Sequence, residues 1–129
     1  MTIAFDQVIP ILRILDEAKA REFYLGFLGF KVDWEHRFDD DAPLYMRVSR
    51  AGLVLHLSEH YGDAIPGASV YVLAKGVEAF HREITAKRYR YLRPGLGEMD
   101  WGGGSARCLN ILDPFGNRIR FVEPKDRPA

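Results

Sequence analysis

The feature of this sequence that most constrains its fold is a repeat of pattern between its two halves. Each half is predicted to run strand, helix and then three strands. A shift of 57 residues superposes the apolar stripes of the two predicted helices, Ala20-Phe23-Phe27 on Val77-Phe80-Ile84. A βαβββ half has a sheet too small to bury both faces, so it needs a partner. The sequence therefore predicts an α+β fold in which two halves form a curved mixed sheet, with helices outside and a concave cleft inside.

The predicted elements follow apolar spacing and turn-forming residues. Asp16 is an N-cap candidate for the first helix, and Gly29 stands where a C-terminal glycine would end it. We expect strands at 8–15, 30–38, 44–50, 53–58, 69–74, 89–92, 106–112 and 118–123, and a second helix from residue 77. The whole chain, 1–129, is predicted to be a single domain with repeats at about 8–62 and 67–124.

Composition narrows the classes of partner. Eighteen Lys and Arg balance eighteen Asp and Glu, so no basic excess favours nucleic acid or a membrane surface. The single cysteine, Cys108, cannot form an internal disulfide or a thiolate zinc cluster. No signal peptide and no apolar run of membrane-spanning length is found. These features predict a cytoplasmic protein.

Alternation along the strands sorts their two faces. Leu53, Leu55 and Leu57 share one side of a strand, which should meet the helices, while His56 and Ser58 take the other side. By the same rule Arg120 points away from its apolar neighbours. This second face either is simply solvated or lines the cleft.

Two local patterns invite a functional interpretation. The string His56-Leu57-Ser58-Glu59-His60 matches a zinc-peptidase motif, but that motif needs a helix and these residues are predicted to continue a strand. Trp101 precedes three glycines, which suggests a flexible lip that closes over a ligand; a dimer contact or a capped sheet edge is the alternative.

Several motifs together resemble the glyoxalase/bleomycin-resistance (vicinal oxygen chelate) superfamily over residues 8–123. They are residues 8–16 (VIPILRILD), 21–24 (REFY), 28–30 (LGF) and, above all, 113–123 (DPFGNRIRFVE). The resemblance implies metal-ligand positions on the first, fourth, fifth and eighth strands, which fall on Ile9, His56, residues 68–70 and Arg120. Only His56 could ligate, and Arg120 is a permanent cation. We therefore expect no catalytic metal and no cofactor.

The metal-free branch of that superfamily comprises the bleomycin-resistance proteins, homodimers that sequester a glycopeptide drug. Pro10 matches the proline at which their N-terminal strands exchange between protomers. Aromatic, acidic and polar matches predict a ligand-binding set for this chain. Its members are Asp33, Trp34, Phe38, His56, Ser58, Glu59, Tyr61, Asp100, Trp101, Gly102, Asn110 and Arg120. The ligand would be a bleomycin-like drug or another flat heteroaromatic compound, bound in two crevices per dimer.

The leading hypothesis is thus metal-independent sequestration of bleomycin-type antibiotics, giving antibiotic resistance by binding rather than by enzymatic turnover. A glyoxalase-superfamily metalloenzyme (lyase, dioxygenase or thiol transferase) with a non-standard metal site is the alternative. A third hypothesis is an interaction module whose hollow holds no ligand. The neutral charge and the arginines near the hollow also leave open a ligand with a carboxylate or phosphate.

Overall fold

The computed structural model describes residues 2–125. The first βαβββ half, here called module 1, contains β1 (Ile11–Arg13), α1 (Glu17–Ala20), the π-helix η1 (Arg21–Phe27), β2 (Lys31–His36), β3 (Tyr45–Arg50) and β4 (Leu53–Ser58). The second half, module 2, contains β5 (Ser69–Leu73), α2 (Val77–Ala86), β6 (Leu96–Trp101), β7 (Gly104–Leu112) and β8 (Arg118–Pro124). The two βαβββ repeats of an α+β fold are confirmed.

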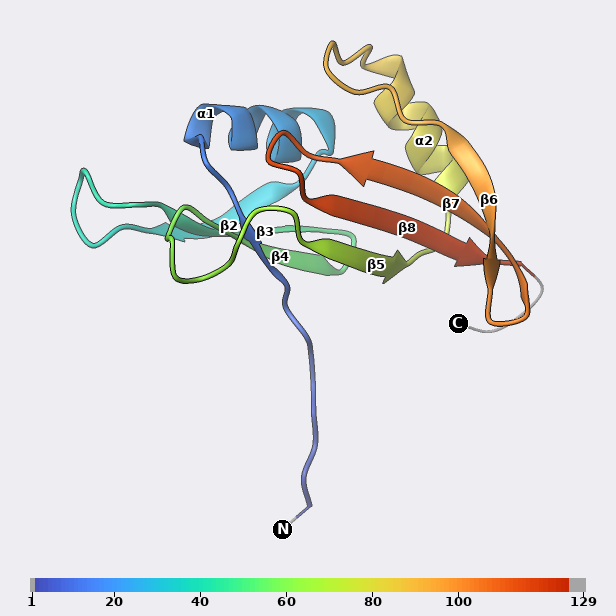
Figure 1. The fold of residues 1–129 in the computed structure, drawn as a ribbon, viewed down its shortest axis with the longest axis horizontal. Helices are drawn as coiled ribbons and strands as arrows, with labels where there is room; N and C mark the ends of the chain where they lie inside the picture. The colour runs from blue at the N-terminus through green and yellow to red at the C-terminus, as the bar shows by residue number, and fades with distance from the viewer. Residues whose placement is uncertain (1, 126–129) are drawn as a thin grey trace.

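Each module forms its own four-stranded mixed sheet. The strand orders are β1-β4-β3-β2 and β5-β8-β7-β6. In each sheet one neighbouring pair is parallel, β1 with β4 and β5 with β8. The two sheets are separate in their hydrogen bonding, because β1 and β5 are both edge strands and each pairs only within its own module. In Figure 1 the helices lie above the sheets, whose lower faces carry no helix.

The first helix begins and ends as its sequence predicts. The Asp16 carboxylate accepts a hydrogen bond from the Lys19 amide at 2.9 Å, and Gly29 follows the helix with φ +77°. Between these ends the last turns widen into a π-helix, in which the Leu28 amide donates to the Phe23 carbonyl. Phe23, Phe27 and Leu28 pack into the core against Met46 and Leu55 of the sheet, among other residues.

The strand expected at 89–92 is not formed. Tyr89 instead stacks on Phe27 at 4.5 Å between ring centroids, and its hydroxyl donates to Glu22, so its apolar ring joins the helix layer. The sixth strand lies further along, at Leu96–Trp101. Its sequence contains glycine and acidic residues, which are uncommon in strands, so the sequence did not predict it.

The residues around Trp101, where the sequence suggested a flexible lip, form the hairpin between β6 and β7. Trp101 ends β6, and Gly102 and Gly103, with φ +55° and +81°, make a two-residue hairpin into β7. Positive φ at both central positions is the geometry of a tight turn that matches strand twist.

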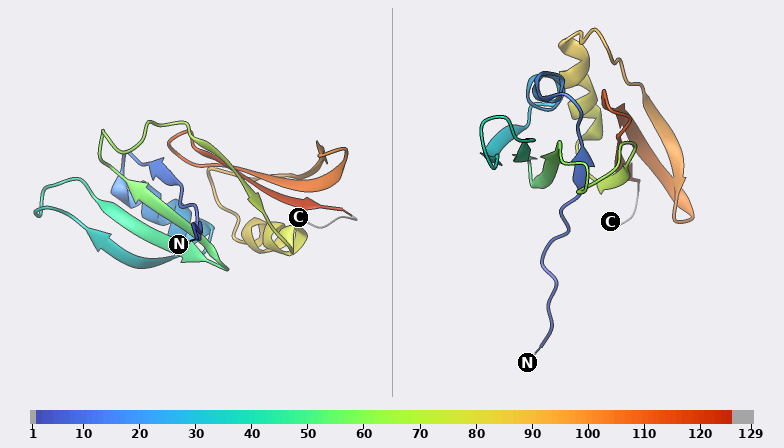
Figure 2. Two further views of the ribbon diagram at one scale, coloured as in Figure 1. Left: turned by 90° about the horizontal axis from the view of Figure 1, so that it is seen from below. Right: turned by 60° about the vertical axis from the view of Figure 1, so that its left-hand side comes forward.

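The first strand is shorter than predicted. Ile11–Arg13 pairs with β4, and the Pro10 carbonyl accepts a hydrogen bond from the His56 amide at 3.0 Å. From this anchor at Pro10, residues 2–10 form an extended arm that leads away from the body (Figures 1 and 2). Ile3, Phe5 and Val8 of this arm are 79%, 96% and 90% exposed. Apolar side chains at such exposure indicate a segment without its packing partner.

The turn Asp113–Asn117 joins the two modules. Both end residues are buried, and the Asp113 carboxylate accepts from the Tyr24 hydroxyl at 2.6 Å and from the Asn117 side-chain amide at 2.8 Å. The same amide donates to the Arg13 carbonyl of β1. A turn of module 2 is thereby fixed to a helix and a strand of module 1.

Within residues 2–125, no helix has both the length and the apolar character needed to cross a bilayer.

Candidate functional site

The faces of the two sheets that point away from the helices carry the predicted ligand-binding side chains. On β4, Leu55 and Leu57 are fully buried against the helices, and His56 takes the opposite side. On β8, Ile119 is likewise buried in the core and Arg120 alternates with it. We call these two surfaces the open face of module 1 and the open face of module 2.

An aromatic cluster occupies the open face of module 1. Trp34 stacks on Tyr45 with ring centroids 5.9 Å apart and planes inclined by 11°, and it meets His56 edge-on at 5.3 Å. Trp34 is 43% exposed, so part of its ring remains available to a flat ligand. Tyr45 was missed by the sequence analysis, although strand alternation places it on the same face as His56.

His56 has one ring nitrogen engaged and one free of partners. Its Nδ1 lies 2.6 Å from the Tyr45 hydroxyl, whereas its Nε2 is buried and has no hydrogen-bond partner among the described residues. Burial, and secondly the charge of Arg47, lower the pKa of His56 from its ordinary value of 6.5. Burial, with a contribution from Asp63, raises the pKa of Tyr45. Both groups are therefore neutral at pH 7, and the pair presents an unsatisfied Nε2.

A β-bulge explains why Asp33 and Trp34 reach the same face. The β2–β3 register shifts between Val32 and Trp34, which puts two consecutive side chains on one side. Asp33 accepts hydrogen bonds from Arg47 and from the Ser49 hydroxyl, at 3.2 and 3.0 Å. The carboxylate of Asp33, one of the predicted ligand-binding residues, is thus already paired with a cation.

A second aromatic cluster occupies the open face of module 2. Trp101 meets Tyr71 edge-on at 5.1 Å, and the Arg120 guanidinium lies 5.3 Å from the Tyr71 ring and donates to its hydroxyl at 3.0 Å. Asn110 is the register neighbour of Arg120. The structure therefore brings Trp101, Asn110 and Arg120 onto one face with Tyr71, which the sequence analysis also missed. Arg107, in contrast, faces the helix side and pairs with Glu78.

The remaining predicted residues lie in loops or are occupied within the chain. Phe38 and Tyr61 are 79% and 88% exposed in the loops after β2 and β4. Ser58 is fully buried and donates to Asp63 at 2.6 Å, and Glu59 accepts from the Leu44 amide at 2.9 Å.

Two further members of the predicted set lie next to Trp101. Asp100 is exposed on β6, and Gly102 forms the turn that follows it.

Within one chain, the two aromatic clusters lie on separate sheets and do not form a common site. Trp34 comes from β2 and Trp101 from β6, which are the strands farthest from β1 and β5 in their sheets. Figures 1 and 2 show these strands at opposite ends of the molecule.

The metal-ligand positions of the superfamily do not fit an ion here. The resemblance implied ligand positions at Ile9 and 68–70, and the register places Ile11 beside His56 and Tyr71 beside Arg120. Ile11 has no donor atom, the Tyr71 hydroxyl is engaged by Arg120, and a guanidinium repels a divalent cation. Among residues 2–125, no group of three His, Cys, Asp or Glu could hold a metal ion.

The string from His56 to His60 is indeed not a peptidase helix. His56 lies within β4, and His60 follows after the strand has ended.

Solved structures with this fold include three informative examples. An antibiotic-binding protein, TnmS3, from a Streptomyces species has a TM-score of 0.69 at 19% identity, covering 96% of this chain and 100% of the other. A bleomycin-binding protein complexed with bleomycin has a TM-score of 0.62 at 23% identity, covering 92% and 98%. A member of the glyoxalase/bleomycin resistance protein/dioxygenase superfamily from Sphaerobacter thermophilus has a TM-score of 0.65 at 18% identity, also covering 92% and 98%.

Sequence comparison identifies the family more directly. No curated protein sequence matches the chain. A family model described as glyoxalase superfamily protein matches residues 1–127, almost the entire length. The chain belongs to the glyoxalase superfamily.

Proposed function

We propose that this chain is a metal-independent binding protein that sequesters glycopeptide antibiotics of the bleomycin type by stacking on their flat heteroaromatic parts. The observation that carries the proposal is the pair of aromatic clusters, Trp34 with Tyr45 and Trp101 with Tyr71, on faces that the helices leave uncovered. Rings presented in this way offer stacking surfaces to a planar ligand. The antibiotic-binding and bleomycin-binding proteins of the same fold support this choice of ligand.

The binding unit in this proposal is a homodimer. Since Trp34 and Trp101 lie at opposite ends of one chain, a second copy is needed to set one cluster against the other. The exposed arm, 2–10, ending at Pro10, would cross to the partner and bury Ile3, Phe5 and Val8. Two equivalent crevices would result from a two-fold axis. Function in the cytoplasm, and as a resistance protein, stays a prediction.

One observation favours a second class of ligand for the same crevice. Arg118 and Arg120 share the open face of module 2 and have no carboxylate partner among the described residues, whereas Asp33 is neutralised by Arg47. A flat ligand that bears a carboxylate or phosphate would satisfy Arg120. Parallel titrations with cationic and anionic planar ligands distinguish the two classes.

Calorimetric titration with copper-loaded and metal-free bleomycin tests the proposal. We expect heat of binding at micromolar protein, with quenching of tryptophan fluorescence. Replacing Trp34 or Trp101 by Ala should raise the Kd by about fivefold each, because a stacked ring contributes about 1 kcal/mol. Tyr91→Ala, which removes an exposed aromatic ring on the helix side, is the matched control and should leave the Kd unchanged.

Two results would contradict this function. Absence of both heat and quenching would remove bleomycin as the ligand. Nickel, zinc, manganese or iron at one equivalent per chain, in protein purified without chelator, would instead support the metalloenzyme alternative.

A further inference from the structure

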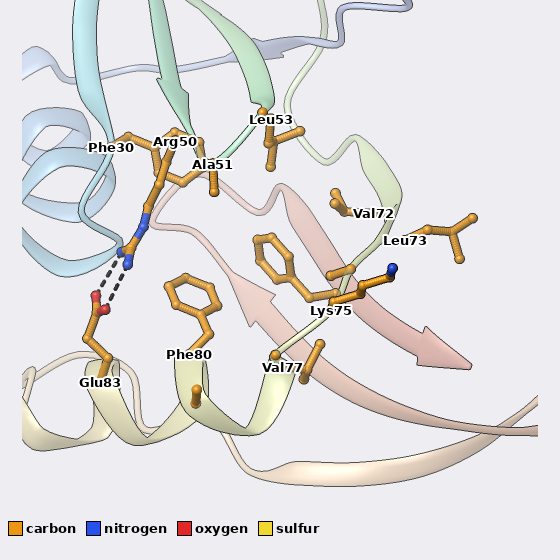
Figure 3. A pocket seen from close by; sticks show the side chains of 15 residues that line it. Phe30, Arg50, Ala51, Leu53, Val72, Leu73, Lys75, Val77, Phe80 and Glu83 are labelled. Atoms are coloured by element: carbon orange, nitrogen blue, oxygen red, sulfur yellow. Dashed lines mark hydrogen bonds and ion pairs between the residues drawn. The ribbon is translucent and has the colours of Figure 1, made fainter. Parts of the chain in front are cut away.

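A groove of about 660 Å³ lies between the modules, away from both aromatic clusters. Its walls come from the β3–β4 turn of module 1 and from β5 and α2 of module 2 (Figure 3). None of the residues that the sequence predicted to bind ligand lines it. Its volume is within the range of small-molecule sites.

The walls of this groove are mainly apolar and aromatic. Phe80 of α2 and Phe121 of β8 pack edge-on at 5.2 Å. Leu53 of module 1 lines the groove on the side opposite Phe80 (Figure 3). Phe30 and Val72 complete the apolar lining. A hydrocarbon or aromatic group placed here would be removed from water on several sides.

The charged groups of the groove leave one cation unpaired. Arg50 and Glu83 form two hydrogen bonds of 2.7 Å at one end, so their charges offset each other. The Arg50 guanidinium also lies 5.1 Å from the centroid of the Phe80 ring. Lys75 lines the same groove, is exposed and has no carboxylate partner among the described residues. The groove therefore combines an apolar interior with one excess positive charge.

We propose that this groove binds an amphipathic anion, with an aromatic or aliphatic body against Phe80 and Phe121 and a carboxylate or sulfonate near Lys75. The site is separate from the crevice of the proposed function and does not depend on it. Because the groove has both modules as walls, such a ligand would also bridge them.

Titration with anilinonaphthalene sulfonate, a fluorescent aromatic anion, tests this site, with dodecanoate as a competing carboxylate. We expect one bound probe per chain, displaced by dodecanoate, and amide shifts in nitrogen–proton NMR spectra at Gly52, Gly76 and Ala79. Shifts confined to His56, Arg120 and the tryptophan indoles would overturn the proposal, since those groups report the open faces.

Paired variants on α2 test the location. Ala79 lines the groove and Ala86 does not, although both are exposed positions of the same helix. Ala79→Phe should weaken probe binding by about tenfold because the added ring fills the space, whereas Ala86→Phe should leave it unchanged. Equal effects of the two variants would contradict the assignment.

A charge-reversal pair tests the anion. Lys75→Glu should weaken binding by about threefold and reverse its dependence on salt, because the attraction of an exposed cation for the anion becomes a repulsion that salt screens. Lys31→Glu, on exposed β2 outside the groove, is the control. No difference between the two would remove the anionic part of the proposal.

Two further experiments distinguish the groove from the crevice of the proposed function, and a small-molecule ligand of the groove from the N-terminal arm of a second copy. A double Trp34→Phe, Trp101→Phe variant should retain the probe, whether or not bleomycin binds to the wild-type protein. Probe binding that appears only after residues 2–9 are deleted would assign the groove to the N-terminal arm of a second copy and overturn the small-molecule proposal.

Discussion

The imidazole of His56 is kept neutral by its surroundings, and this has consequences for pH. Its pKa lies below 6.5, firstly because of burial and secondly because of Arg47. Between the folded and unfolded pKa values the unfolded chain binds more protons, so the free energy of unfolding falls as pH drops below 6.5. A ligand that donates a hydrogen bond to Nε2 needs the neutral ring and should therefore bind best above pH 6.5.

Arg47→Gln should raise the pKa of His56 while leaving it below 6.5, since burial, the larger cause, remains. NMR titration of the His56 ring proton measures this shift. Arg82→Gln, which removes an exposed arginine on α2, serves as the control and should not move it. An unchanged or lowered pKa in Arg47→Gln would contradict the role assigned to Arg47.

At the scale of elements, the turn Asp113–Asn117 is important because one carboxylate satisfies several buried donors. Asp113 Oδ1 accepts from the amides of Phe115 and Asn117, both at 2.8 Å, and Oδ2 accepts from Tyr24 and the Asn117 side chain. Burial and the adjacent Asp113 raise the pKa of Tyr24 well above its ordinary range, which keeps its hydroxyl a donor. Removing the carboxylate would leave these donors unpaired in the interior.

Asp113→Ala should lower the free energy of unfolding by about 3 kcal/mol, and Tyr24→Phe by about 1 to 2 kcal/mol. The double variant should cost little more than Asp113→Ala, because the two share one hydrogen bond. Urea unfolding measures all three, and Asp39→Ala in an exposed turn should change stability by less than about 0.5 kcal/mol. Strict additivity of the two losses would show that the turn does not couple the modules through Tyr24.

At the scale of the whole molecule, the arm 2–10 leaves apolar side chains in solvent, while each open face carries only half of the aromatic surface. The proposed association of two copies would account for both features. Deleting residues 2–9 should shift sedimentation from dimer towards monomer at micromolar concentration and weaken bleomycin binding. Phe5→Ser, which removes the most exposed of the three apolar side chains, should produce the same shift to a smaller extent. A full-length chain that sediments as a monomer would contradict the dimer.

The elements that follow from local pattern were predicted well, and those that depend on distant contacts were not. The helix between Asp16 and Gly29 is encoded by its cap, its apolar spacing and its terminal glycine. The strand expected at 89–92 failed because the ring of Tyr89 packs on Phe27, a contact between residues far apart in sequence. At the candidate site, Trp34, His56 and Arg120 could be found from alternation and resemblance. Tyr45 and Tyr71 were missed because their relevance comes from strand register.

The sequence by itself determined the repeated βαβββ order and the faces of the strands, because periodicity is a local property. Only the tertiary structure decided that Asp33 is already paired with Arg47, that Ser58 is buried and that the two aromatic clusters lie on separate sheets. It also created the groove between Leu53 and Phe80, whose walls belong to different modules. These features depend on which surfaces meet after the chain has folded, and no spacing along the sequence specifies that.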